Sequence, residues 1–262
     1  MVGPAEPPSA ETLRQENAQL AADLAAAQRD NRGYRDLLVA AAHEMRTPLH
    51  AILLTLEMIA RLSGPEHESA RKTQIERAKR VLKDYVSRTS ILLDAGRLTG
   101  DVFRLNREPV AVEELVSAVT DLYAAKAESR GVRIEVDIAP GMVGHWDRAA
   151  VETILANLVS NALKYGEGTP VVVSGKIDNG NAVIRVADYG PGIPDDQRIR
   201  IFEKFNRPVS STSNVGYGLG LWIAQEFARL HRGSIMLEPT SSGSTFVVTL
   251  PIGHSTAAGS VA

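Results

Sequence analysis

The sequence contains no cysteine, which excludes disulfides, thiolate nucleophiles and cysteine-ligated zinc sites. The formal net charge is only -2, so no overall positive field attracts nucleic acid or an anionic membrane. An anionic ligand would therefore need a local site. A membrane-spanning run is also lacking, because the nearest apolar stretch, 49–62, is short and is interrupted by Thr55 and Glu57. The chain starts with a polar, Pro-rich tail rather than a signal peptide, and we expect a cytoplasmic protein.

What is present indicates several structural units, since 262 residues with 44% hydrophobic residues can form more than one core. Residues 9–30 have no Gly or Pro, which favours a long helix. Apolar and Asn residues recur there at alternate spacings of four and three, typical of a coiled-coil seam. The seam residues are Leu13, Asn17, Leu20, Leu24, Ala27, Asn31, Tyr34 and Leu38. Asparagine in a seam favours a parallel homodimer, and a single amphipathic helix packed on its own core is the alternative.

A helical hairpin is expected next. One heptad run extends from Ala42 to Ile59, Ser63-Gly64-Pro65 ends the helix, and a second run extends from Ile75 to Leu92. Two such hairpins, one from each chain, would make a dimeric four-helix bundle.

Beyond residue 100 the pattern changes to mixed strands and helices. The expected elements are an extended segment at 102–110, a helix at 112–126, a strand at 132–138, a helix capped by Asp147 and ended at Gly166, strands at 170–175 and 182–188, a helix at 219–230, and strands at 234–238 and 244–250. Because the elements do not alternate as βαβ units, the predicted fold is an α/β sandwich with helices on one face of a mixed sheet.

The whole chain is thus predicted to combine an all-α part with an α+β part. The expected domains are a disordered tail at 1–8, a coiled coil at 9–37, a helical hairpin domain at 38–99, a linker at 100–106, an α/β sandwich domain at 107–252 and a disordered tail at 253–262.

One histidine stands in an unusual local setting. His43 falls just outside the heptad seam, and Glu44 can orient its imidazole and accept a proton from it. Pro48 removes the hydrogen-bond donor for the carbonyl of Glu44, so the helix should bend beside His43. Thr47, one turn further on, could hydrogen-bond a water or a phosphoryl group. An exposed histidine taken alone is more often just a solvated residue.

Two further patterns suit a nucleoside triphosphate. In the segment NLVSNALKY, Asn157, Asn161 and Lys164 share one face of an otherwise apolar helix, where amide oxygens suit Mg²⁺ and lysine suits phosphate. A polar solvent face is the alternative interpretation. At the end of a strand, Asp188 could accept a hydrogen bond from the amine of adenine, and the glycines of DYGPGIP would let backbone approach the base.

These patterns lie within five ordered motifs, and the chain resembles the sensor histidine kinases of two-component signalling over about residues 38–252. The motifs are the H box HEMRTPLH, the N box NLVSNALKY, the G1 box DYGPGIP, the F box FEKF and the G2 box GYGLGL. The one departure is that Gly166 and Glu167 follow the N box where the family commonly has Thr or Ser and then Pro.

The resemblance implies that residues 38–99 form a dimerisation and histidine phosphotransfer domain and that residues 107–252 form an ATP-binding catalytic domain. It also implies roles for the matching residues. His43 would accept the γ-phosphoryl group of ATP, Glu44 would act as base, and Thr47 would position water for dephosphorylation of a partner. Asn161 would bind Mg²⁺, with Asn157 as a second candidate ligand. The implied ATP-binding residues are Asn157, Asn161, Lys164, Tyr165, Asp188, Gly190, Gly192, Phe202, Phe205, Arg207, Gly216, Gly218, Leu219 and Gly220.

The sequence therefore predicts an enzyme that autophosphorylates His43 from Mg-ATP and passes the group to an aspartate of a response regulator receiver domain. Receiver contacts are expected on residues 50–57 and 81–92, which flank His43. A non-catalytic coiled-coil scaffold with a vestigial nucleotide site is the alternative. An ATPase of the chaperone or topoisomerase branch is a second rival, but it leaves the H box unexplained. No nucleic-acid partner is expected.

Overall fold

The computed structural model describes residues 19, 45–46, 48–98, 104–206, 218–240 and 242–253. The chain divides into two units, Met1–Thr99 and Gly100–Ala262, and each is considered by itself. Apart from Gln19, the predicted coiled coil lies outside the described residues, as does the predicted tail at 1–8 and all but Gly253 of the one at 253–262. None of the helices in the described part of the chain combines the length and apolar character that a membrane crossing requires.

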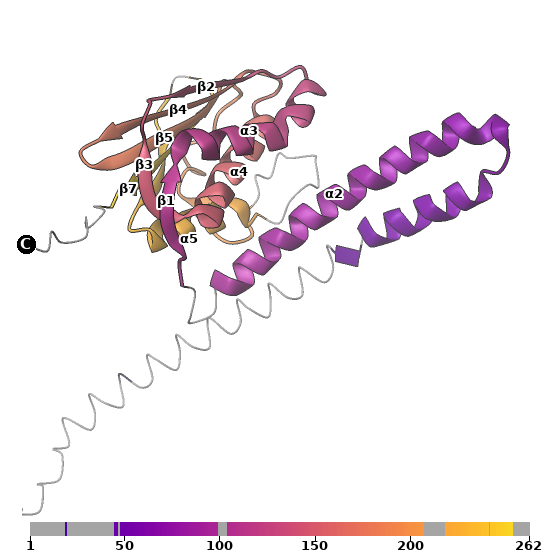
Figure 1. Cartoon of the computed structure of the whole chain (residues 1–262), viewed down its shortest axis with the longest axis horizontal. Coiled ribbons are helices and arrows are strands. Elements are labelled where there is room, and N and C mark those ends of the chain that lie inside the picture. The colour runs from indigo at the N-terminus through magenta and orange to yellow at the C-terminus, as the bar shows by residue number, and fades with distance from the viewer. Residues whose placement is uncertain are drawn as a thin grey trace, which may run out of the picture. The chain divides into compact units, whose positions relative to one another are not determined.

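The first unit is a helical hairpin, as the sequence predicts. Residues 48–61 are helical, a short 3₁₀ turn η1 (Pro65–His67) follows, and α2 (Glu68–Leu98) runs back alongside the first helix (Figure 1). Gly64 has φ +95°, a left-handed conformation that favours glycine, and its carbonyl accepts the N–H of His67 at 3.2 Å. The reversal therefore occurs at the predicted Ser63-Gly64-Pro65 break.

One stripe of each helix is shielded within the hairpin. Thr55 is 7% exposed and Ala95 is fully buried, while Ile59 and Leu92 are half-buried. Ile59 and Leu92 belong to the predicted heptad runs, but Thr55 and Ala95 do not, so the shielded stripe only partly follows those runs.

A second apolar stripe remains uncovered by the described residues of this chain. Its members are Leu49, Leu53, Leu56, Ile75, Leu82, Val86 and Leu93, each between 36% and 60% exposed. On α2 the spacing from Ile75 is seven, four and seven residues, which places all four side chains on one line along the helix. Such a continuous apolar stripe indicates an interaction surface.

The second unit is an α/β sandwich. Its elements are β1 (Arg107–Ala111), α3 (Val112–Glu128), β2 (Ile134–Ile138), β3 (Val143–Asp147), α4 (Arg148–Tyr165), β4 (Val171–Asp178), β5 (Asn181–Asp188), the 3₁₀ turn η2 (Arg200–Phe202), α5 (Gly220–Leu230), β6 (Ser234–Glu238) and β7 (Ser244–Pro251).

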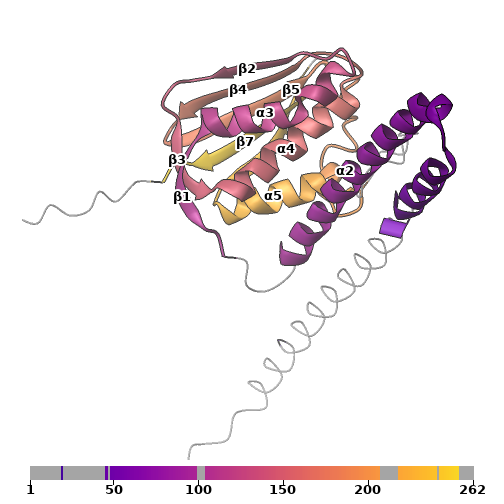
Figure 2. The ribbon, with the colours of Figure 1, turned by 45° about the vertical axis from the view of Figure 1, so that its right-hand side comes forward.

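Five strands form one mixed sheet in the order β2-β4-β5-β7-β6, in which only β2 and β4 pair in parallel. Helices α3, α4 and α5 cover one face of this sheet (Figure 2). The predicted mixed sheet with helices on one face is confirmed.

The central helix α4 begins and ends where the sequence predicts. The Asp147 side chain accepts the N–H of Ala150 at 3.0 Å, which satisfies one of the free amides of the first turn. Gly166 forms the C-terminal cap. The buried side of α4 includes Ile154, Leu155 and Leu158, each at most 1% exposed. Helix α4 therefore presents a fully apolar side to the sheet and leaves its other side for polar groups.

Two features of the sheets were not predicted. Strand β3 pairs with β1 in a separate two-stranded sheet, and there Trp146 is 1% exposed and donates its Nε1–H to the carbonyl of Pro251 at 2.8 Å. Strand β4 also runs three residues further than expected, because Asn179 and Gly180 form a tight hairpin turn with φ of 48° and 75°. An Asn-Gly pair between two strands is a common signal for such a turn.

A buried histidine connects α5 to the start of α4. His231 is 1% exposed, its Nε2 accepts the N–H of Asp147 at 3.0 Å, and its Nδ1 lies 2.7 Å from the carbonyl of Phe227. An imidazole that accepts at Nε2 and donates from Nδ1 is neutral. Burial lowers the pKa of His231, and the nearby Arg107 lowers it further. These contacts give His231 a structural role.

The same cluster includes Asn106, the last residue of the predicted linker, and Arg107, which follows it. The N–H of Asn106 donates to the second carboxylate oxygen of Asp147 at 2.8 Å, and the guanidinium of Arg107 donates to the carbonyl of Leu230 at 3.2 Å. The carboxylate of Asp147 thus caps α4 and holds the entering chain at the same time.

We predict that His231→Leu destabilises the second unit by about 1–3 kcal/mol near neutral pH, because the N–H of Asp147 loses its buried acceptor. Between the lowered pKa of His231 and the value of about 6.5 of an unfolded histidine, the unfolded chain binds more protons. Wild-type stability therefore falls as the pH falls through that window. The difference in unfolding free energy between wild type and His231→Leu should be smaller at about pH 5.5 than at about pH 7.5.

Denaturant unfolding followed by tryptophan fluorescence measures this difference, since Trp146 and Trp222 both lie in the second unit. The control is His145→Leu on exposed β3, which should show no such narrowing. A difference in unfolding free energy between wild type and His231→Leu that is constant or grows toward low pH would contradict the assignment of His231 as a neutral, buried acceptor.

Candidate functional site

The N box lies on α4, on the side that does not pack into the core. Asn157, Asn161 and Lys164 are half-buried there. The Asn157 side chain donates to the carbonyl of Thr153 at 2.9 Å, which leaves its amide oxygen as an acceptor. The Lys164 ammonium bonds the hydroxyl of Tyr165 at 2.7 Å and lies 4.5 Å from the centre of its ring. Two amides and a cation thus share one face of the helix, as predicted.

The G1 box begins at a buried carboxylate. Asp188 ends β5, is 5% exposed, and accepts the N–H of Gly190 at 3.0 Å. Burial raises its pKa, and hydrogen bonds from the backbones of Gly190 and Ser244 partly offset this. A carboxylate held in this way has a fixed direction and a low-dielectric environment, which suits the recognition of a single polar group.

Close backbone contact joins the G1 box to the end of α4. A Cβ atom added to Gly190 would lie 2.7 Å from the carbonyl oxygen of Tyr165 and 2.8 Å from the Cα of Gly166. One added to Gly166 would lie 2.6 Å from the carbonyl oxygen of Ala162. Both glycines are therefore required by packing, because any side chain would separate the two segments.

Gly243, in the turn before β7, is a site residue that the sequence analysis missed. It has φ +70°, and a Cβ at this position would overlap the carbonyl oxygen of Asp188 and lie 2.6 Å from the Cα of Tyr189. The predicted Gly192, with φ +77°, approaches Gly243 in turn. The local signal for Gly243 was only a Ser-Gly-rich turn, which does not show what the turn packs against.

The F and G2 boxes contact each other. The N–H of Phe205 donates to the carbonyl of Gly218 at 2.9 Å, and Gly218 has φ +66° with its Cα packed against Asn206. Phe202 packs edge-on against Phe246, with ring centres 6.3 Å apart. Lys204 of the F box also lies 4.3 Å from the ring centre of Trp222 in α5, a cation–π contact that was not predicted.

Helix α5 brings the G2 box to the N box. Leu219 is buried at the N-terminal cap of α5 and makes no side-chain hydrogen bond there. A Cβ added to Gly220 would lie 2.5 Å from the amide oxygen of Asn157. The first turn of α5 therefore lies directly against Asn157, and helix N-terminal amides of this kind attract anions.

These contacts gather four of the five motifs in one place in the second unit. The described members are Asn157, Asn161, Lys164, Tyr165, Asp188, Gly190, Gly192, Phe202, Phe205, Gly218, Leu219 and Gly220. The predicted site residues His43, Glu44, Thr47, Arg207 and Gly216 lie outside the described residues. In the H box, Met45, Arg46 and Pro48 to His50 are helical.

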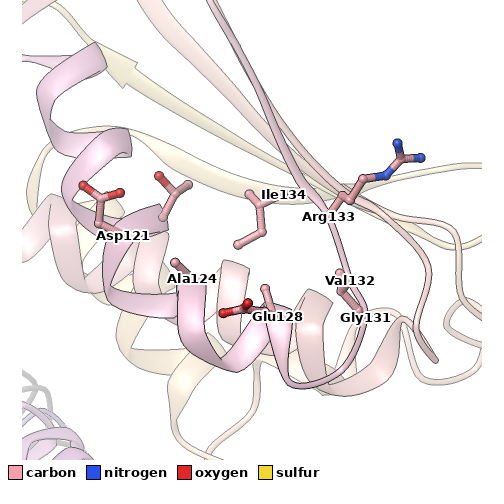
Figure 3. A pocket seen from close by; sticks show the side chains of 9 residues that line it. Asp121, Ala124, Glu128, Gly131, Val132, Arg133 and Ile134 are labelled. Atoms are coloured by element: carbon pink, nitrogen blue, oxygen red, sulfur yellow. The ribbon is translucent and has the colours of Figure 1, made fainter.

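A separate surface hollow lies between α3 and the segment that leads into β2 (Figure 3). Asp121 and Glu128 line it from α3, and Val132 to Ile134 line it from the other side. Of the predicted site residues that the structure describes, none lines this hollow. This hollow is therefore distinct from the place where the four motifs meet.

Two family models match the chain. Residues 146–254 match the histidine kinase-, DNA gyrase B- and HSP90-like ATPase model, and residues 34–94 match the His Kinase A (phospho-acceptor) domain. The first match contains the four motifs that meet around α4, and the second contains the H box.

Curated relatives agree with both matches. The chain is 32% identical over 222 residues to the sensor-like histidine kinase SenX3 of Mycolicibacterium smegmatis, covering 83% of this chain and 57% of that protein. It is 30% identical over 226 residues to the sensor histidine kinase TmoS of Ectopseudomonas mendocina, covering 83% of this chain and 23% of that protein. The chain thus spans little more than half of one relative and about a quarter of the other.

Among solved structures, full-length ShkA in complex with AMPPNP has a TM-score of 0.61 to this structure at 27% identity. The likeness covers 85% of this chain and 47% of ShkA.

We predict that Gly243→Ala destabilises the second unit more than Gly180→Ala does. Both glycines have left-handed backbones, with φ of 70° and 75°, so each alanine should cost about 1–2 kcal/mol from backbone strain. Only at Gly243 does the new methyl group meet the backbone of Asp188, which should add about 1–3 kcal/mol.

Denaturant midpoints of the two variants, followed by tryptophan fluorescence, measure the difference. Gly180 is the matched control, because no atom lies within 4 Å of its added Cβ. Equal losses of stability for the two variants would show that the contact of Gly243 with the backbone of Asp188 leaves room for a methyl group.

Proposed function

The chain belongs to the sensor histidine kinases, and from this we propose that it transfers the γ-phosphoryl group of ATP to His43 and then to an aspartate of a response regulator receiver domain. The observation that carries the proposal is the meeting of the N, G1, F and G2 boxes around one end of α4, in a chain that also matches a phospho-acceptor domain.

We propose that ATP binds where these motifs meet. Asp188 would accept a hydrogen bond from the exocyclic amine of adenine, because its carboxylate is buried and held by backbone amides. The glycines of the G1 box let this turn pack directly against the end of α4 and against Gly243, which holds the backbone beside Asp188 in place. Lys164 and the uncapped first turn of α5 would bind phosphate oxygens by charge and by N–H groups. Tyr165 would border the nucleotide, and Phe202 and Phe205 would anchor the segment that covers it.

The donor set around α4 fits Mg²⁺ carried by the nucleotide. Among the described residues, no three His, Cys, Asp or Glu side chains are grouped to hold a metal ion, so a metal would take amide and phosphate oxygens. Asn161 is the proposed ligand and Asn157 the second, since both amides face away from the core. When bound, Mg²⁺ would neutralise phosphate charge.

In the proposed reaction a neutral imidazole nitrogen of His43 forms a P–N bond as the bond between the γ-phosphorus and the bridging oxygen breaks, and ADP leaves. The proton of the imidazole passes to Glu44. In the second step the P–N bond breaks, the aspartate of the receiver takes the phosphoryl group, and the imidazole regains its proton. Such transfers depend on alignment and charge neutralisation. Thr47 would position water when the regulator is dephosphorylated.

We propose that a second copy of the chain covers the outer apolar stripe of the hairpin. The stripe lies beside the shielded faces of both helices, so two hairpins could pair through it into a four-helix bundle. Two other exposed apolar residues, Leu54 and Met58, are 60% and 45% exposed and fall on a different face of the same helix. They would instead contact the receiver.

Two other functions remain to be distinguished. A non-catalytic scaffold would dimerise without forming phosphohistidine, and an ATPase of the chaperone or topoisomerase branch would hydrolyse ATP independently of His43. The first of the following experiments separates all three.

We predict that the wild-type chain incorporates ³²P from γ-labelled Mg-ATP in an acid-labile, alkali-stable form, and that His43→Gln incorporates none, because the nucleophile is gone. His145→Gln on exposed β3 should keep the label. Labelling of His43→Gln would refute the assignment of the nucleophile. Unlabelled wild type that dimerises would favour the scaffold, and ATP hydrolysis unchanged in His43→Gln would favour the ATPase.

We predict that Leu53→Glu weakens the dimer about 30-fold or more, because burying an unpaired carboxylate costs at least about 2 kcal/mol. The matched control is the neighbouring Leu54→Glu, which starts from a similar exposure but lies on a different face of the helix. Dimer dissociation constants from analytical ultracentrifugation compare the two variants. Equal constants, or a greater effect at Leu54, would show that the proposed interface is wrong.

A further inference from the structure

The turn between α4 and β4 contains the one departure from the family pattern, Gly166 and Glu167. The N–H of Thr169 donates to the carbonyl of Gly166 at 3.0 Å, which closes the turn. Its two central residues, Glu167 and Gly168, have φ of 51° and 85°. Left-handed conformations at both positions define a sharp turn that few residues adopt without strain. The departure in sequence therefore produces a specific backbone shape that ends at Thr169.

The hydroxyl of Thr169 bridges two segments of the candidate site. It donates to the carbonyl of Gly166 at 2.7 Å and accepts the N–H of Tyr189 at 3.1 Å. A Cβ at Gly166 would lie 3.2 Å from both this hydroxyl oxygen and the Cβ of Asp188. Thr169 thus fills the space beside Asp188 that a side chain at position 166 would enter.

This bridge holds the peptide that follows Asp188. The N–H of that peptide belongs to Tyr189 and bonds Thr169, while its carbonyl oxygen packs against the Cα of Gly243. Because a peptide unit is planar and rigid, contacts on both sides fix its orientation and with it the backbone of Asp188. The carboxylate is held separately by Gly190 at 3.0 Å. Loss of the Thr169 bond would therefore release one side of the Asp188 turn.

We propose that Thr169 is a positioning residue for base selectivity, which aims the carboxylate of Asp188 at the amine of adenine. The inference rests on the proposed nucleotide site. A threonine that only stabilised the fold would, when removed, weaken the binding of all nucleotides alike.

The test compares Thr169→Val, which keeps the shape but removes the hydroxyl, with Thr169→Ser, which keeps the hydroxyl. Affinity is measured by calorimetry for ATP and for purine riboside triphosphate, which lacks only the exocyclic amine. Thr169→Val should lose about fivefold in affinity for ATP, the factor expected from one net hydrogen bond, and little for the analogue. Thr169→Ser should restore the preference for ATP.

Thr120→Val is the matched control. Its hydroxyl also donates to a carbonyl three residues earlier, that of Ser117 at 3.0 Å, but it lies on α3, which contributes none of the candidate nucleotide residues. It should leave both affinities unchanged. In the free protein, Thr169→Val should also speed the hydrogen exchange of the Tyr189 amide, and Thr120→Val should not.

The outcomes are distinguishable. If wild type prefers ATP and Thr169→Val shows the same preference, or if Tyr189 exchange does not change, the role of Thr169 is refuted while the nucleotide site stands. If Thr169→Val loses the same factor in affinity for ATP and for the analogue, Thr169 has only a general structural role. If wild type binds neither nucleotide, or does not distinguish them, the proposed adenine role of Asp188 fails, and with it the inference.

Discussion

The backbone contact between the end of α4 and the turn after β5 is the constraint on which the second unit depends. Gly166 and Gly190 lie too close for either to carry a side chain, so the helix with the amides and the strand with Asp188 meet at atomic contact. The other motifs attach to this junction: Gly243 packs on the carbonyl of Asp188, and Gly220 packs on Asn157. Each of these contacts involves the backbone of a glycine. Backbone conformation therefore determines most of the shape of the site, and the polar side chains extend from that backbone.

Local patterns predicted most elements, because the physical causes of those elements are local. The apolar spacing of α3, α4 and α5, the cap at Asp147 and the stop at Gly166 all act within one or two turns of a helix. The four motifs of the second unit were also predicted to belong together, and the structure brings their described residues together. The contribution of each residue to nucleotide binding stays a prediction.

The features that were missed depend on distant partners. Strand β3 is a short segment with glycine and histidine, and its place is fixed by pairing with β1 and by Trp146 reaching Pro251. The contacts of Gly243 with Asp188 and of Lys204 with Trp222 join segments far apart in sequence, and no local pattern encodes them. In the hairpin, the predicted heptad seam contained four members of the exposed apolar stripe, Leu49, Leu56, Ile75 and Leu82. It did not contain the other three, Leu53, Val86 and Leu93. The exposed stripe is wider than a seam of strict heptad spacing, which is why the seam missed them.

The carboxylate of Asp147 has a mechanical consequence. One oxygen holds the first turn of α4 and the other holds the amide of Asn106, where the chain enters the second unit. A pulling force on the chain at Asn106 would therefore act on the same carboxylate that caps the start of α4. The other end of α4 carries Lys164 and contacts Gly190. Because α4 is a continuous helix between these two ends, a displacement at Asp147 would be transmitted along the helix axis to the end that contacts Gly190.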